Sequence, residues 1–179
     1  MIIKISNSLK MVPLALSHAE ELFSLVDLNR DYLHQWMGWL DKTTAVADVE
    51  TFIKECDEQN EKGCGLQFVI TEEDDICGIL NFHRIDKMHN TGEIGYWLSQ
   101  SHAGRGIMNL AVKELVRIGF RELNLNIIEI HCAEANVKSR AVPERLGFTY
   151  EATLRQREWL YSKYVNHAIY SMLASEYRK

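Results

Sequence analysis

The pattern of apolar and polar residues predicts helices in the first third of the chain. Behind Ser17, a good helix N-cap, apolar residues recur every three or four positions as far as Val26. The same spacing predicts a second helix at about Tyr32–Trp39. A third is expected at about Asp48–Lys62, where Gly63 ends it. Each segment has the apolar face with which a helix covers a sheet.

In the middle of the chain the pattern changes to that of strands. Leu66–Thr71 and Ile76–His83 are rich in β-forming residues and flank the acidic turn Glu72–Asp75, which predicts an antiparallel hairpin. A turn at Asn90–Gly92 then opens a further strand, Glu93–Leu98.

A strand–helix–strand unit follows. After the loop Ser99–Gly106, an amphipathic helix is expected at about Ile107–Glu122, and then a short buried strand at Ile127–Cys132. Such a crossover joins two parallel strands. A short helix is expected between Asn136 and Gly147.

Two last strands, Phe148–Trp159 and Tyr164–Leu173, are joined by a turn at Tyr161–Lys163. The whole order predicts an α+β fold with a mixed, mostly antiparallel sheet, one central parallel strand pair and flanking helices. The 179 residues suit a single domain spanning 1–179.

Composition excludes several classes of protein. With 20 Lys and Arg against 25 Asp and Glu, the net charge is −5, so the chain lacks the cationic field of a non-specific nucleic-acid binder. Its apolar runs are shorter than a membrane span, and Met1–Leu14 has no signal-peptide pattern, so we expect a cytoplasmic protein. The four cysteines are widely spaced. They indicate reduced thiols and no metal site.

The loop Ser99–Gly106 is the most informative segment for chemistry. A Gly-x-Gly turn between a strand and a helix presents free backbone N–H groups to an anion, and Arg105 adds a cation. The loop is neither a dinucleotide fingerprint, because position 109 is Asn, nor a Walker loop, because Ile107 follows Gly106. A plain strand-to-helix turn is the alternative interpretation.

Two motifs resemble the GNAT superfamily of N-acetyltransferases. Ser101–Gly106 is similar to its Gln/Arg-x-x-Gly-x-Gly/Ala loop, with Ser in place of Gln or Arg at the first position. The Asn-x-x-Ser and Glu-Arg-Leu-Gly-Phe of Asn136–Phe148 resemble its second cofactor motif, most closely in the branch of ribosomal-protein serine N-acetyltransferases (RimL type). Glu158-Trp159 followed by Tyr164–His167 is also similar to that branch.

The resemblance implies a GNAT-type sheet whose parallel strands splay apart and hold acetyl-CoA between them, with no metal. It implies cofactor contacts from the backbone of two strand residues, from the loop and from the second motif: Trp97, Leu98, Ala103, Gly104, Arg105, Gly106, Ile107, Asn136 and Ser139. Asn136 is equally well explained as a helix N-cap.

Ser139 is the expected proton donor to the departing thiolate. Many GNAT relatives place a Tyr for this role at the position of Pro143, and the resemblance to the RimL-type branch transfers the role to Ser139. Pro143 inside a helix also leaves the carbonyl four residues earlier, that of Ser139, without its helical partner.

Glu158 is the expected general base. If the strand Phe148–Trp159 has no bulge, Glu158 shares the core-facing side with Phe148, and a desolvated carboxylate accepts a proton more readily. The resemblance places the base at the same position. An exposed residue behind a bulge is the alternative.

The acceptor is predicted less sharply than the donor. In the family, the helix–loop–helix containing Asn29, Arg30, Trp36 and Trp39 lines the acceptor cleft, although tryptophans are more often plain core residues. The branch favours the N-terminal amine of a ribosomal protein, reached by direct attack. A polyamine, amino acid or antibiotic amine, or a CoA sensor without turnover, are the alternatives. A homodimer is possible.

Overall fold

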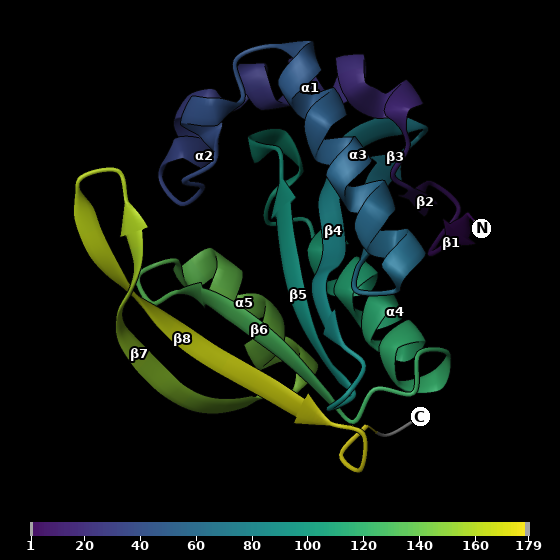
Figure 1. The fold of residues 1–179 in the computed structure, drawn as a ribbon, viewed down its shortest axis with the longest axis vertical. Helices are drawn as coiled ribbons and strands as arrows, with labels where there is room; N and C mark the ends of the chain where they lie inside the picture. The colour runs from purple at the N-terminus through teal and green to yellow at the C-terminus, as the bar shows by residue number, and fades with distance from the viewer. Residues whose placement is uncertain (1, 178–179) are drawn as a thin grey trace.

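The fold is one eight-stranded sheet with helices on both faces (Figure 1). A computed structural model describes residues 2–177. The strand order is β1-β2-β3-β4-β5-β6-β8-β7, and only β5 and β6 are parallel within this part of the chain. The strands are β1 (Ile3–Lys4), β2 (Leu9–Pro13), β3 (Leu66–Glu72), β4 (Asp75–Asp86), β5 (Thr91–Leu98), β6 (Ile127–Ala133), β7 (Thr149–Leu160) and β8 (Lys163–Leu173).

The helices form two groups, one on each face of the sheet. Alternate residues of a strand point to opposite faces, so Leu80 packs with α4 and α5 while its neighbour Ile79 packs with α1 and α3. The helices are α1 (Ala19–Leu28), α2 (Arg30–His34), α3 (Val46–Lys62), α4 (Ile107–Arg121) and α5 (Val137–Leu146), with short 3₁₀ turns at Leu16–His18, Leu40–Lys42 and Gln100–His102. No described helix is long and apolar enough to cross a membrane.

The parallel pair separates halfway along its length. β5 and β6 are paired only from Thr91 opposite Ile127 to Ile94 opposite Ile130. β5 then stays with β4 as far as Leu98, and β6 stays with β8 as far as Ala133. The two halves of the sheet therefore diverge, as Figure 1 shows. The predicted α+β fold, with a mostly antiparallel sheet and a splayed central parallel pair, is confirmed.

Two predictions about the N-terminal helices are wrong. Ser17 lies in a 3₁₀ turn, and α1 begins at Ala19, because the ring nitrogen Nδ1 of His18 accepts from the Ala15 N–H at 3.1 Å and caps this turn instead. The second helix ends at His34, so Trp36 and Trp39 lie in the following turns. The sequence did not predict the edge strand β1 or its neighbour β2.

The predicted side-chain alternation of β7 is wrong as well. Its register against β8 shifts between Tyr150 and Ala152 and again between Leu154 and Glu158. β7 is an edge strand, and most of its residues are exposed. The bulges break the alternation on which the inward orientation of Glu158 depended.

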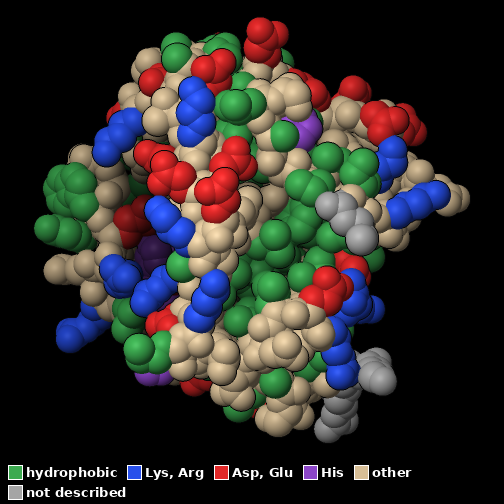
Figure 2. Space-filling view, turned by 45° about the vertical axis from the view of Figure 1, so that its right-hand side comes forward, with side chains coloured by type: hydrophobic (Ala, Val, Ile, Leu, Met, Phe, Trp, Pro, Cys, Tyr) green, Lys and Arg blue, Asp and Glu red, His purple; other side chains and the backbone are tan. Residues whose placement is uncertain are grey.

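The surface charges are mixed. Figure 2 shows acidic and basic side chains side by side on the face it presents, with no continuous basic area. All four cysteines are free thiols, as predicted, and the described residues contain no cluster of three or more His, Cys, Asp and Glu that could hold a metal ion.

Gly78 lets β4 approach the end of β5, which leads to a prediction. A Cβ at this position would lie 2.1 Å from the Trp97 carbonyl oxygen and 2.9 Å from the Leu98 Cα. Because both are backbone atoms, Gly78→Ala must displace β5, and we expect it to lower the free energy of unfolding by about 2 kcal/mol or more. Urea denaturation measures this. An unchanged midpoint would show that β5 is free to shift.

Candidate active site

The loop between β5 and α4 presents a row of free backbone donors. The N–H groups of His102 and Ala103 are used within the 3₁₀ turn, where they bond to the carbonyls of Ser99 and Gln100. The backbone N–H groups of residues 104–108 have no hydrogen-bond acceptor within residues 2–177. These groups surround the N-terminus of the 15-residue helix α4, an arrangement that binds anions.

The two glycines make this loop open as well as tightly turned. Gly104 and Gly106 have φ angles of 78° and 81°, a backbone conformation that residues other than glycine rarely adopt. A Cβ added to either would have nothing within 4 Å. The backbone of the loop is therefore accessible to a phosphate-sized group.

The side chain of Arg105 is directed away from this cradle. Its guanidinium forms a bidentate pair with Glu72, at 2.8 and 2.9 Å. Arg105 therefore offers a backbone N–H to the cradle rather than a free charge. Ser101, which departs from the family pattern, has its hydroxyl 3.1 Å from the His102 ring nitrogen Nδ1.

The edge of β5 that faces the split also carries free backbone groups. In an antiparallel pair alternate residues bond to the partner strand. The Ser99 N–H bonds to Cys77 on the β4 side, so Trp97 and Gly95 also face β4. Tyr96 and Leu98 consequently direct their N–H and C=O groups into the gap. Leu98 can thus contact a ligand through its backbone. The backbone of Trp97, for which a cofactor contact was expected, faces β4 instead, and its side chain is buried among the residues that pack with α1 and α3.

Ser139 lies in the first turn of α5, where Asn136 and Tyr96 hold it. The Asn136 side chain is the helix N-cap and accepts from the Ser139 N–H at 3.1 Å. The Ser139 hydroxyl donates to the Tyr96 phenol oxygen at 3.3 Å. The Tyr96 hydroxyl in turn donates to the Ser139 carbonyl at 2.8 Å.

Pro143 explains why Tyr96 is needed. A proline has no N–H, so the carbonyl of Ser139, four residues earlier, has lost its helical donor. The Tyr96 hydroxyl supplies the replacement from β5. Burial raises the pKa of the Tyr96 phenol, which keeps this donor protonated. Sequence reasoning missed Tyr96, although its alternation with Ile94 on β5 placed it on this face.

Glu158 lies on the opposite face of the sheet, paired with a histidine. Its carboxylate is 2.8 Å from the His167 ring nitrogen Nε2. The Glu158 side chain is 37% exposed and that of His167 17%. Glu158 therefore lies at the solvent boundary, because of the β7 bulge. The role of His167 as its partner had no signal in the sequence beyond the family resemblance.

A cavity of about 530 Å³ opens at the β7–β8 hairpin. Val165, which is paired with Glu158, lines it, but Glu158 itself does not. The cavity is bounded by the turn after α2, the end of β6 and the β7–β8 hairpin, and its lining includes Trp36, Ala133 and Tyr164. The hairpin tip closes one side, because the Tyr161 hydroxyl donates to the Met37 carbonyl and its ring stacks on His34 at 3.7 Å.

The other residues predicted for the acceptor cleft hold its wall together. The Asn29 side chain donates to Leu25 and accepts from the Gln100 N–H at 2.8 Å, so it ties α1 to the anion loop. Arg30 donates to the carbonyls of Leu40 and Thr43. These bonds fix the turn that carries Trp36 and Trp39. Trp39 lies against Trp97, with ring centroids 6.1 Å apart.

A second charged cluster lies on the same face of the sheet. Glu93 is 3.0 Å from His131 and 3.3 Å from His83. Burial alone would raise the pKa of Glu93, but the bonds to His131 and His83 outweigh it and hold that pKa well below its usual range. The bond to Glu93 raises the pKa of His131, against burial and the nearby charge of Arg157.

This cluster predicts a pH-dependent contribution to stability. The pKa of His131 is higher in the folded than in the unfolded chain, where it is about 6.5. Its stabilisation is therefore complete below about pH 6.5 and is lost as the pH rises through the folded value. We expect the difference in unfolding free energy between the wild type and His131→Gln to shrink from pH 6 to pH 9. A difference that stays constant over this range would contradict the assignment.

The loop and the split sheet together define a class of enzyme. A helix N-terminus with free N–H groups beside an open strand edge suits a phosphate-bearing ligand with an extended arm. The model of the acetyltransferase (GNAT) domain matches residues 8–149. The chain therefore belongs to the GNAT acetyltransferase family and is an N-acetyltransferase.

Relatives and solved structures show which members of this family the chain is similar to. The chain is 31% identical, over 96% of both chains, to the ribosomal-protein-serine acetyltransferase of Escherichia coli K12. A RimL ribosomal-protein acetyltransferase solved with coenzyme A superposes with a TM-score of 0.93 at 27% identity, over 97% of this chain and 98% of that one. A microcin self-immunity acetyltransferase, solved with acetyl-CoA and AMP, gives 0.91 at 30% identity, over 96% and 95%.

Proposed function

We propose that the chain transfers an acetyl group from acetyl-CoA to the α-amino group at the N-terminus of a ribosomal protein, by direct attack while both substrates are bound. Acetyl-CoA supplies an acetyl group that its thioester bond has activated. Its diphosphate fits the free N–H groups of residues 104–108, and its thiol-bearing arm fits the open edge of β5 at Leu98.

One observation carries this proposal. Ser139 and Glu158 belong to opposite faces of the sheet, and both lie at the end where β5 and β6 have parted. Ser139 is tied to Tyr96 on β5, and Glu158 is tied to His167, which is opposite Ala133 at the end of β6. An acid and a base on either side of such a gap can serve a donor and an acceptor that meet within it.

Each residue has a distinct task in this mechanism. Glu158, held by His167, accepts the proton from the attacking amine, directly or through water. The Leu98 N–H points into the gap and can stabilise negative charge that develops on the acetyl oxygen. Ser139 donates a proton to the departing sulfur, and the phenol of Tyr96 keeps its hydroxyl in position.

Direct attack of the amine on the thioester agrees with the protonation state of Cys132, a cysteine on one of the two strands that border the gap. Cys132 lies on β6 and is buried. Burial raises the pKa of the Cys132 thiol to about 11, so it remains protonated near neutral pH. A protonated thiol is a poor nucleophile, which supports a mechanism without an acetyl-cysteine.

A polypeptide end is favoured as acceptor on two grounds. The relatives with high coverage include a ribosomal-protein-serine acetyltransferase. The cavity of about 530 Å³ also lies between the turn after α2 and the β7–β8 hairpin, and it is lined by Val165, the strand partner of Glu158, so a chain end can enter while the rest of its protein stays outside. An enzyme with this acceptor acts in the cytoplasm.

The direct test is release of CoA with a panel of amines. We expect turnover with peptides that begin with serine, no turnover with the same peptides blocked at the N-terminus, and weak turnover with spermidine. Intact-mass analysis locates the acetyl group. Preference for spermidine would instead show a small-amine enzyme. Tight CoA binding with no turnover of any amine would show a sensor.

Glu158→Gln tests the general base. Removing the proton acceptor should lower kcat by about 10²–10⁴-fold and leave the affinity for CoA nearly unchanged. The control is Glu151→Gln, which changes a carboxylate of the same strand that bonds Ser171 and should retain most activity. Equal losses of turnover and of CoA affinity would assign Glu158 a structural role.

Ser139→Ala and Tyr96→Phe together test the proton donor. Ser139→Ala should slow turnover by about 10–10²-fold with little effect on CoA binding, because only the proton for the sulfur is lost. Tyr96→Phe should also destabilise the fold by about 1–3 kcal/mol, since it leaves the Ser139 carbonyl without a donor. A normal rate in Ser139→Ala would remove this hydroxyl from the mechanism.

A further inference from the structure

One histidine lies between two carboxylates at the end of the parallel strand pair. Glu93 on β5 is opposite Glu129 on β6, and the last pair, Ile94 with Ile130, follows directly. His131, the next residue of β6, has its ring nitrogen Nδ1 3.0 Å from the Glu93 carboxylate and its Nε2 3.5 Å from that of Glu129. The ring thus spans both strands at the point where they part.

This bridge separates two like charges. Opposite residues of paired strands point to the same face of the sheet, and like charges there destabilise the pairing. The side chains of Glu93 and His131 are only 19% and 17% exposed, so water screens their charges weakly. The bond to Glu93 raises the pKa of His131, so its ring stays protonated to a higher pH than that of a free histidine. The positive charge then offsets the repulsion between Glu93 and Glu129.

His83 holds Glu93 from the other side. Its ring nitrogen Nε2, on β4, lies 3.3 Å from the Glu93 carboxylate. A Cβ added to Gly95, the next β5 residue on this face, would lie 3.0 Å from the His83 Nδ1, so the ring occupies the space above that glycine. Glu93 is therefore clamped from both neighbouring strands, directly below the gap.

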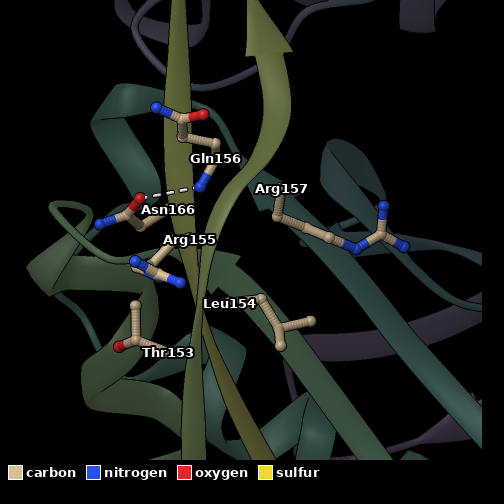
Figure 3. A pocket seen from close by; sticks show the side chains of 6 residues that line it. All are labelled: Thr153, Leu154, Arg155, Gln156, Arg157 and Asn166. Atoms are coloured by element: carbon tan, nitrogen blue, oxygen red, sulfur yellow. Dashed lines mark hydrogen bonds between the residues drawn. The ribbon is translucent and has the colours of Figure 1, made fainter.

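The nearest basic charge on β7 does not displace the bridge. Arg157 opposes protonation of His131, but the bond to Glu93 outweighs it. Arg157 belongs to the wide bulge of β7, where the Gln156 N–H bonds to the Asn166 side chain at 2.9 Å. Figure 3 shows this bond, and the Arg157 side chain extending away from the strand.

The acidic partners of His131 are the two carboxylates of the strand pair. On β8, His167 is committed to Glu158 at 2.8 Å. Within residues 2–177, Glu93 and Glu129 are the only carboxylates at ion-pair distance from the His131 ring.

We infer that His131 is a positioning residue for acetyl-CoA: by bridging Glu93 and Glu129, it fixes the point at which β5 and β6 part. This inference rests on the proposed function, in which residues 104–108 bind the diphosphate and the arm enters the gap. Without the bridge the two carboxylates repel each other, and the strands are free to part earlier. The arm must then order a gap that is no longer preformed, which weakens binding of the arm and leaves binding of the nucleotide unchanged.

Two ligands separate the arm from the nucleotide. Acetyl-CoA, added without an acceptor amine, occupies both the anion loop and the gap, whereas 3′-phospho-ADP, the nucleotide half of CoA, reaches only the loop. Isothermal titration calorimetry measures both dissociation constants. For His131→Gln we expect the Kd for acetyl-CoA to rise by about 3–10-fold and that for 3′-phospho-ADP to stay within about twofold of the wild-type value.

A second substitution distinguishes charge from packing. His131→Gln/Glu129→Gln removes the carboxylate that otherwise faces Glu93 without a bridge, and it should recover most of the lost affinity for acetyl-CoA. A ring that merely filled space would allow no such recovery. The control is Glu122→Gln, which removes a carboxylate that bonds Arg117 just after α4 and should bind both ligands as the wild type does. Melting temperatures establish that each variant is folded during the titrations.

The pH dependence gives a second readout. Both ligands carry the same phosphates, so the ratio of their Kd values cancels phosphate ionisation. Because the folded pKa of His131 is raised, the bridge is complete below about pH 6.5 and is lost as the pH rises through the folded value. The advantage of the wild type over His131→Gln in this ratio should therefore shrink from pH 6 to pH 9.

The outcomes separate this inference from the proposed function. If the wild type binds acetyl-CoA no more tightly than 3′-phospho-ADP, the arm does not occupy the gap, and the proposed function fails together with the inference. If acetyl-CoA binds more tightly but His131→Gln keeps the whole difference, or if Glu129→Gln restores nothing in that variant, the inference alone is wrong.

Discussion

The parting of β5 and β6 after Ile94 and Ile130 is the constraint on which the rest of the site depends. Each strand keeps its outer partner to the end, so the sheet stays intact while its two halves separate. The inner edges are then left with backbone groups that no strand satisfies. Since buried backbone groups are almost always hydrogen-bonded, this edge is suited to a ligand that supplies the missing partners.

The need to pair backbone hydrogen-bonding groups also explains the surroundings of Ser139. Pro143 removes a helical donor, the freed carbonyl accepts from Tyr96, and the Tyr96 oxygen accepts from the Ser139 hydroxyl. One side chain thus supplies the missing helix donor and holds the Ser139 hydroxyl. The donor that Pro143 lacks is thus supplied by a tyrosine on a different element.

The features that were predicted best from the sequence are those decided by neighbouring residues. Gly104 and Gly106 specify an open turn by themselves, and the Asn136 cap and the ends of α3 and α5 follow from single residues. Features set by distant segments were not predictable. The bulge that repositions Glu158 depends on Asn166, which Glu134 holds. The β5 strand gave no sign that Tyr96 would be needed by a helix forty residues away.

The same division separates the donor side of the site from the acceptor side. The proposed donor side consists of backbone groups and two glycines, and backbone N–H groups can bind a diphosphate whatever the neighbouring side chains are. The acceptor side consists of the turn that Arg30 fixes, the contact between Tyr161 and Met37, and the bulge of β7. These are contacts between segments far apart in sequence, and few of them involve the sheet ladder. Substitutions in them can therefore change the acceptor while the sheet and the donor site stay intact, so the acceptor has to be inferred from side chains particular to this chain.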